Sequence, residues 1–180
     1  MTASLGNISP DWQGCDRAEQ RLIAKILKHE GTGRAIQVFA KHCKRFSDYW
    51  YWYTLGTLWV SYSGWSDLRL WRRLFLSQRP NRATSLMKPD EWQAFQQLPV
   101  HVVVYRAHRP QETDWIAYTL DPQIAARFAR EREVSQVSQY LLDKDKVMAL
   151  FLRRKEAEII ALQPQDAVHV RDIPVVPVSL

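Results

Sequence analysis

Apolar residues at helical spacing dominate the first hundred positions of the chain. Behind Asp16, a residue suited to cap a helix, apolar side chains recur three and four residues apart as far as Leu27. The run at 49–62 contains no charge and is dense in aromatic residues; it also fits strand alternation, but its helical neighbours favour a buried helix. Helices are therefore predicted from Asp16 to the breaking glycines at 31 and 33, over Arg34–Lys44, over 49–62, over Leu68–Leu76, and from Pro89 to just before Pro99.

The pattern changes at Pro99 to short runs of β-branched and apolar residues, which are typical of strands. One helix interrupts them, beginning at Asp121 and Pro122. Many short strands with a single helix among them predict an α+β fold with little room for parallel βαβ units. The predicted strands are Val100–Tyr105, Trp115–Leu120, Val134–Leu142, Lys146–Leu152, Ala157–Leu162 and Val168–Val170, and the apolar helix face is Ile124, Ala125, Phe128 and Ala129.

This change of pattern divides the chain into a helical region, residues 1–97, and a strand-rich region, residues 98–180, which we expect to pack as one compact unit. No apolar run approaches the ~20 residues that span a bilayer, so we expect a cytoplasmic protein without membrane contact. The two cysteines, Cys15 and Cys43, are predicted to be reduced, and no histidine spacing suggests a metal site.

Charge is distributed unevenly between the two regions. Residues 1–100 hold 14 Lys and Arg against 8 Asp and Glu, a balance of 14 − 8 = +6, whereas residues 101–180 hold 11 of each. The basic half also contains seven of the eight tryptophans. Basic and aromatic residues together suit a polyanion with stackable bases. A basic, solvated helical surface over a Trp-rich core is the alternative interpretation, and composition alone favours it.

Three fragments of the strand-rich region occur in a specific order. The first ends a predicted strand with a basic residue, the second joins a strand to a helix, and the third holds two carboxylates two residues apart. They are Val104-Tyr105-Arg106-Ala107, then Ala117-Tyr118-Thr119-Leu120-Asp121 leading to Ala126-Arg127-Phe128-Ala129, then Glu156-Ala157-Glu158-Ile159-Ile160. Each fragment alone is a weak signal, and the ordered set is much more specific.

Together the fragments resemble the Arg / Ser-x-Thr / Glu-x-Glu arrangement of the ADP-ribosyltransferases related to cholera toxin, most closely small bacterial and phage-associated toxin or defence members. The resemblance covers residues 98–165 closely, and the Trp-rich first half more loosely. It implies a split β-sandwich that binds NAD in a cleft between two small sheets, without a Rossmann motif or a metal. The implied activity is that of an NAD-dependent glycosyltransferase.

The resemblance also implies roles for individual residues. Glu158 would stabilise the oxocarbenium-like centre formed when the nicotinamide–ribose bond breaks, and Glu156 would orient or deprotonate the acceptor. Arg106 would pair with the pyrophosphate of NAD. Thr119 would hold the strand and the catalytic carboxylate through its hydroxyl, while Tyr118 would offer an aromatic face to the NAD rings or to the core.

The chain departs from the family pattern at two positions. Ala117 stands where the family has the first serine of Ser-x-Thr, and Ala107 stands where a glycine follows the first arginine. Ala107 and His108 remain candidates for NAD contact, His108 on the adenosine side, although a surface histidine is the simpler interpretation.

Structural alternatives remain open for the central residues. Arg106 taken alone could be a surface arginine at a strand end. Glu156 and Glu158 could form the exposed face of an edge strand, paired with the cations at Arg153, Arg154 or Lys155.

The acceptor is the least determined part of the prediction. The charge of the first half favours a nucleic acid, RNA in particular, over a protein arginine. A toxin or anti-phage effector of this kind would also need a cognate antitoxin. A degenerate domain that binds NAD or nucleic acid without turnover is a further alternative. Candidate nucleic-acid contacts are Arg69, Arg72, Arg73, Arg79 and Arg82.

Overall fold

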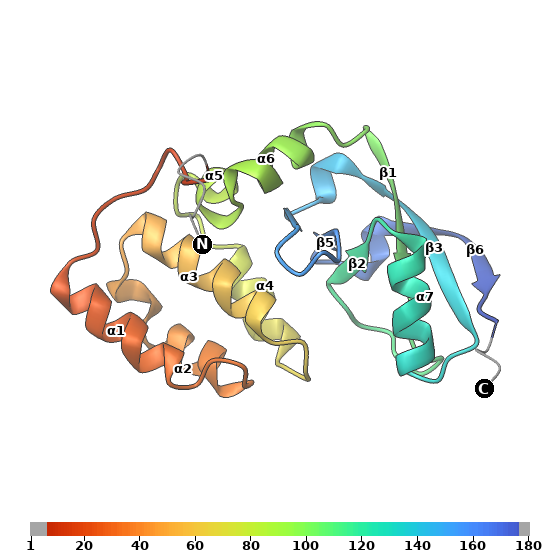
Figure 1. Cartoon of the computed structure of the whole chain (residues 1–180), viewed down its shortest axis with the longest axis horizontal. Coiled ribbons are helices and arrows are strands. Elements are labelled where there is room, and N and C mark those ends of the chain that lie inside the picture. The colour runs from red at the N-terminus through yellow and green to blue at the C-terminus, as the bar shows by residue number, and fades with distance from the viewer. Residues whose placement is uncertain (1–6, 177–180) are drawn as a thin grey trace. The chain divides into compact units, whose positions relative to one another are not determined.

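The computed structural model describes residues 7–176, which divide after Gln93 into two compact units (Figure 1). The first unit is helical and the second contains the strands, so the α+β class is confirmed. None of the helices between residues 7 and 176 is long and apolar enough to cross a membrane.

The helices of the first unit follow the predicted pattern. Asp16 caps the first of them, accepting a hydrogen bond of 2.8 Å from the backbone N–H of Glu19, as predicted. A short helix that the sequence analysis missed begins after Asn81, whose backbone is left-handed at φ 57°. The helices are α1 (Arg17–Leu27), α2 (Arg34–His42) with a 3₁₀ turn at Cys43–Arg45, α3 (Asp48–Ser61), α4 (Leu68–Phe75), α5 (Arg82–Leu86) and α6 (Pro89–Gln96), which runs into the second unit.

Helix α3 lies at the centre of the first unit because it is apolar around most of its circumference. Two of its buried polar groups donate to backbone carbonyls of the segments that follow it. The Tyr51 hydroxyl donates to the carbonyl of Leu74 at 2.7 Å, and the Trp52 indole N–H donates to the carbonyl of Pro80 at 3.0 Å. The uncharged run is therefore a buried helix rather than a strand.

Within residues 97–176, six strands pair in antiparallel fashion and one α-helix, α7, accompanies them. The order across the sheet is β4-β5-β2-β1-β3-β6. Helix α7 lies against one face of the sheet, over β1 and β3 (Figure 1). The bounds are β1 (His101–Arg106), β2 (Ala117–Thr119), α7 (Pro122–Glu131), β3 (Gln136–Asp143), β4 (Ala149–Phe151), β5 (Glu158–Ile160) and β6 (Ala167–Pro174), with 3₁₀ turns at Lys144–Lys146 and Pro164–Asp166.

The expected split into two sheets is wrong for the described strands, because backbone pairing joins them into one sheet. The sheet is nevertheless almost divided between β2 and β1. These two strands share a single residue pair, Tyr105 with Thr119, whereas β1 and β3 pair along six residues. The sheet therefore has its weakest junction where the first two motifs meet.

The two faces of the sheet have separate cores. On one face, Ala125 and Ala129 of α7 pack in a buried cluster with Ala107 and Val137. On the other face, buried side chains such as Val104 stand opposite buried partners on β3. Alternation along β1 thus assigns Arg106 to the Val104 face and Tyr105 to the face that α7 covers.

Candidate active site

The three motif strands are far apart in sequence and adjacent in the sheet. Strand β2 lies between β1 and β5, and Thr119 pairs with Tyr105 on one side and with Glu158 on the other. The three residues form one row across the sheet, so their side chains leave it on the same face. The first, second and third motifs therefore meet at the junction between β1 and β2.

The two glutamates converge on one arginine. Arg154 Nη2 lies 3.1 Å from a carboxylate oxygen of Glu156 and 3.5 Å from one of Glu158. Arg127 of α7 reaches the other oxygen of Glu156 at 3.2 Å. Only 16% of the Glu156 side chain and 13% of the Glu158 side chain are exposed. The carboxylates are therefore held together in a largely shielded place.

The backbone that brings them together is not the regular strand that the sequence suggested. Strand β5 begins at Glu158, and the preceding Ala157 has a left-handed backbone with φ 43°. Glu156 and Glu158 therefore do not lie on one strand, because this turn separates them. The alternative that the glutamates lie on an edge strand is wrong, since β5 lies between β4 and β2. The part of that alternative that paired the glutamates with a preceding cation is confirmed at Arg154.

Thr119 fixes this turn. Its buried hydroxyl donates to the backbone carbonyl of Glu156 at 2.6 Å and accepts from the backbone N–H of Asp121 at 3.1 Å. Thr119 was expected to hold the strand through its hydroxyl, and the hydroxyl does so by binding the main chain of Glu156 just before β5. The register pairs Ala117 with Ile160, two residues away from the Thr119–Glu158 pair. The missing serine hydroxyl at Ala117 is therefore not opposite Glu158.

Arg106 is a largely buried cation, with 11% of its side chain exposed. One guanidinium nitrogen donates to the carbonyl of Ala117 at 2.9 Å, another forms a short ion pair with Glu112, and the guanidinium carbon lies 5.1 Å from the ring centre of Trp115. Its Nε is buried without a hydrogen-bond partner among the described residues. Burial lowers the pKa of the Arg106 guanidinium, and the charge of Glu112 opposes this shift. The surface-arginine alternative is thus wrong.

The polar contacts of the Arg106 side chain given above are to Ala117 and Glu112. The Arg106 side chain leaves β1 on the opposite face from the Tyr105–Thr119–Glu158 row, by the alternation of the strand. The structure therefore joins Arg106 to the second motif through the backbone of Ala117.

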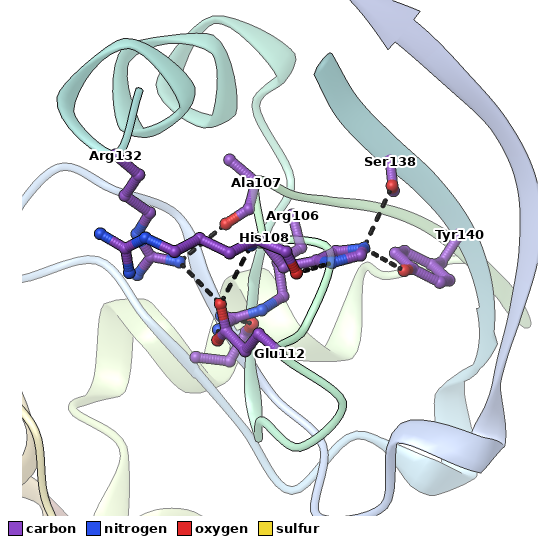
Figure 2. A network of polar contacts seen from close by, with 9 residues as sticks. Arg106, Ala107, His108, Glu112, Arg132, Ser138 and Tyr140 are labelled. Carbon is purple, nitrogen blue, oxygen red and sulfur yellow. Dashed lines mark hydrogen bonds and ion pairs between the residues drawn. The ribbon is translucent and has the colours of Figure 1, made fainter. Parts of the chain in front are cut away.

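Glu112, which the sequence analysis did not single out, links several groups of the loop between β1 and β2. Besides Arg106, its carboxylate lies 3.8 Å from Arg132 and accepts from the backbone N–H of Arg109 at 3.4 Å (Figure 2). Burial raises the pKa of the Glu112 carboxyl, but the charge and hydrogen bond of Arg106, with Arg132 assisting, outweigh burial and leave it below its ordinary value. Glu112 is therefore an anion between two arginines.

The remaining predicted NAD contacts on this unit are mostly structural. Tyr118 is 4% exposed and meets Tyr140 edge-on at 5.7 Å, and burial raises the pKa of its hydroxyl to about 12. Ala107 is buried in the α7 cluster, and its carbonyl accepts a hydrogen bond of 2.7 Å from Arg132. Neither side chain presents a free surface to a ligand.

His108 stacks on Trp115 with ring centres 4.8 Å apart, so it is not a simple surface histidine. Its Nε2 lies 3.1 Å from the Tyr140 hydroxyl and 3.3 Å from the Ser138 hydroxyl (Figure 2). Ser138 in turn donates to Asp172 at 2.7 Å. Arg106, His108 and Trp115 thus form one cationic and aromatic group at the end of β1.

The arginines proposed to contact nucleic acid all belong to the first unit, at α4 and the segment that follows it. Arg69 and Arg73 are exposed on α4, while Arg72 and Arg82 are half-buried. Arg79 is engaged internally, donating to the carbonyls of Phe46 and Cys43 and to the Asp48 carboxylate. These contacts measure 2.8, 3.2 and 2.8 Å. Arg79 therefore has a structural role in this unit.

Comparison of the chain with models of protein families, with curated proteins and with solved structures found no match. Within residues 7–176 no group of three or more His, Cys, Asp or Glu side chains is arranged to hold a metal ion. The functional argument therefore depends on the residues themselves.

Proposed function

We propose that the second unit transfers ADP-ribose from NAD to a macromolecular acceptor, with Glu158 as its central carboxylate. One observation carries the proposal. The three motifs that resemble an ADP-ribosyltransferase come from separate parts of the chain, and they lie on adjacent strands, with Thr119 paired to both Tyr105 and Glu158. Nothing in the sequence spacing alone requires that adjacency.

The residues at this junction suit the reaction. NAD supplies an activated ribose, whose bond to nicotinamide breaks with the electron pair leaving on nicotinamide. A shielded carboxylate such as Glu158 stabilises the positive charge that develops on the ribose. Glu156 takes the proton from the acceptor as the new bond to the ribose forms.

Arg154 and Thr119 position these two carboxylates. Arg154 contacts both of them, which offsets the repulsion between neighbouring anions and fixes their separation. Thr119 holds the Glu156 main chain next to the start of β5. These are positioning residues, since their contacts are to the glutamates and not to the reacting atoms.

Arg106 fits the diphosphate of NAD by its chemistry. A guanidinium pairs with phosphate through several N–H groups, and Arg106 carries a buried Nε with no hydrogen-bond partner among the described residues. The guanidinium lies against the buried ring of Trp115, on which the half-buried His108 also stacks. We therefore assign diphosphate binding to Arg106.

The favoured acceptor is a nucleic acid, RNA in particular. All of the net charge of +6 belongs to residues 1–100, and Arg69 and Arg73 are exposed there on one helix. In this proposal the protein is a toxin or anti-phage effector, and a cognate antitoxin restrains it in its host.

The test uses NAD labelled in its ADP-ribose part and three separate acceptor pools: total RNA, single-stranded DNA and lysate protein. Purified full-length protein is compared with Glu158→Gln, which keeps the shape and removes the charge, and with Glu131→Gln as a control on the exposed surface of α7. We expect label on the RNA pool, lost with Glu158→Gln and retained with Glu131→Gln. Label on protein alone would refute the nucleic-acid acceptor, and no label on any pool would refute the transferase.

A further inference from the structure

The loop between β1 and β2 holds a carboxylate in a position suited to a phosphate group. Its residue Glu112 extends one oxygen, Oε1, to Arg106 and the other, Oε2, to Arg132 and to the backbone N–H of Arg109 (Figure 2). Two guanidinium groups and one backbone N–H around an anion are the donors that bind phosphates in proteins.

Two arginines face the Glu112 carboxylate. Arg106 is largely buried, and charge interactions in so shielded a region are stronger than in water. A diphosphate group, with a charge near −2 and oxygens on two phosphorus atoms, matches both cations better than the carboxylate does.

Glu112 is held mainly by these ion pairs. Its neighbours in the loop, Gln111 and Thr113, are exposed, and the turn is closed by a hydrogen bond of 3.0 Å from its backbone N–H to the carbonyl of Arg109. The carboxylate can therefore leave the two arginines by side-chain rotation, without disturbing the core of the sheet.

We propose that Arg106, Arg132 and the Arg109 backbone N–H form a diphosphate-binding subsite, and that Glu112 is a tethered competitor for it. The identification of NAD as the diphosphate ligand depends on the proposed function; the subsite itself does not. Arg132 is the new binding residue, and Glu112 sets how much ligand is needed to open the site. The half-buried His108, which stacks on the buried Trp115 next to Arg106, is the ring placed to contact the group that the diphosphate carries.

The competition between the Glu112 carboxylate and a free anion can be measured as a change in anion affinity. A tethered carboxylate that fills the site about nine tenths of the time lowers the apparent affinity for a free anion about tenfold. Removing its charge with Glu112→Gln, which retains the shape of the side chain, should therefore tighten anion binding by at least that factor. An ordinary structural ion pair predicts the opposite, because breaking it would loosen the loop and weaken the site.

The experiment measures binding of inorganic pyrophosphate to the full chain by calorimetry at fixed ionic strength. The variants are Glu112→Gln, Arg132→Gln and, as a control of equal charge change, Glu131→Gln. Arg132 is preferred to Arg106 for substitution because a third of its side chain is exposed, 33% against 11%, so the variant is expected to fold. Thermal melting of each variant checks this.

We expect Glu112→Gln to bind pyrophosphate about tenfold tighter than the wild type or better. Arg132→Gln should bind it more weakly, and Glu131→Gln should bind it as the wild type does. Three results would overturn the subsite. The wild type and Glu112→Gln could bind pyrophosphate with equal affinity, or Glu131→Gln could raise the affinity as much as Glu112→Gln does. The third is that neither the wild type nor Glu112→Gln binds pyrophosphate. None of these measurements requires turnover, so a subsite that binds pyrophosphate in a protein that consumes no NAD would refute the proposed function alone.

Discussion

The hydroxyl of Thr119 offers the sharpest test of how the glutamates are positioned. Thr119→Val keeps the shape of the side chain and removes the group that donates to the Glu156 carbonyl and accepts from the Asp121 N–H. Thr119 is 4% exposed, so its hydroxyl is shielded from water where it contacts the Glu156 carbonyl. An unsatisfied buried polar group costs about 1–3 kcal/mol, and the variant should lose about 2 kcal/mol of unfolding free energy.

Calorimetry of the second unit measures this loss. For a unit of fewer than 100 residues, a loss of about 2 kcal/mol lowers the melting temperature by roughly 8–16 °C. Transfer activity should fall further, by about tenfold to hundredfold, because a carboxylate displaced by about 1 Å loses that much. Thr119→Ser is the matched control, since it keeps the hydroxyl and should keep most of the activity.

Two results would refute this reasoning. Thr119→Val with the melting temperature of the wild type would show that the hydroxyl does not support the turn before β5. If Thr119→Ser lowered stability and activity as much as Thr119→Val does, the lost methyl contacts would matter and the hydrogen bonds would not.

Three further predictions concern other parts of the molecule. Glu19→Ala should destabilise the first unit by about 2–3 kcal/mol in denaturant melts, because the buried carboxylate accepts from both the backbone N–H and the hydroxyl of Ser47 at the start of α3; loss of less than about 0.5 kcal/mol would contradict this. Ala157→Gly should raise the stability of the second unit by about 0.5–1 kcal/mol, because glycine adopts φ 43° without the clash of a Cβ atom; a destabilised variant would show that the turn is not strained. Hydrogen bonds from His169 and Ser138 hold the pKa of the Asp172 carboxyl below its ordinary 3.8. The stability that this carboxylate contributes is therefore present above pH 3.8 and is lost as the pH falls through the lower pKa of the folded protein. In melts at a series of pH values, Asp172→Asn should lose less stability on acidification than the wild type, and an equal loss would exclude Asp172 as a contributor.

The elements that local sequence determines were predictable. Asp16 and the apolar spacing that follows identified α1, and the uncharged aromatic run identified α3. Strand β6 was predicted only at Val168–Val170, because Arg171 and Asp172 end the apolar pattern; the strand continues to Pro174 through backbone pairing with β3. An exposed edge strand needs no apolar side chains to pair, so hydrophobic pattern underestimates its length.

The site was predictable in its residue types and less so in its geometry. The order of the motifs predicts that Glu158, Glu156 and Arg106 belong to one site, and this stays a prediction. The structure places Glu156 before β5 and not on it. The left-handed backbone at Ala157 leaves no sequence signal, since such a turn is expected at glycine or asparagine. Glu112 was missed because it lies in a polar loop, where a glutamate is ordinary until its partners are known.

The central claim is that the chain breaks the nicotinamide–ribose bond of NAD at Glu158. The most direct measurement is nicotinamide release, followed by chromatography, from NAD incubated with wild type or with Glu158→Gln, each with and without RNA. The account predicts release by the wild type that RNA accelerates, and no release by a Glu158→Gln protein that melts as the wild type does. Absence of release from the wild type with RNA, DNA or lysate protein, or full release by Glu158→Gln, would contradict it.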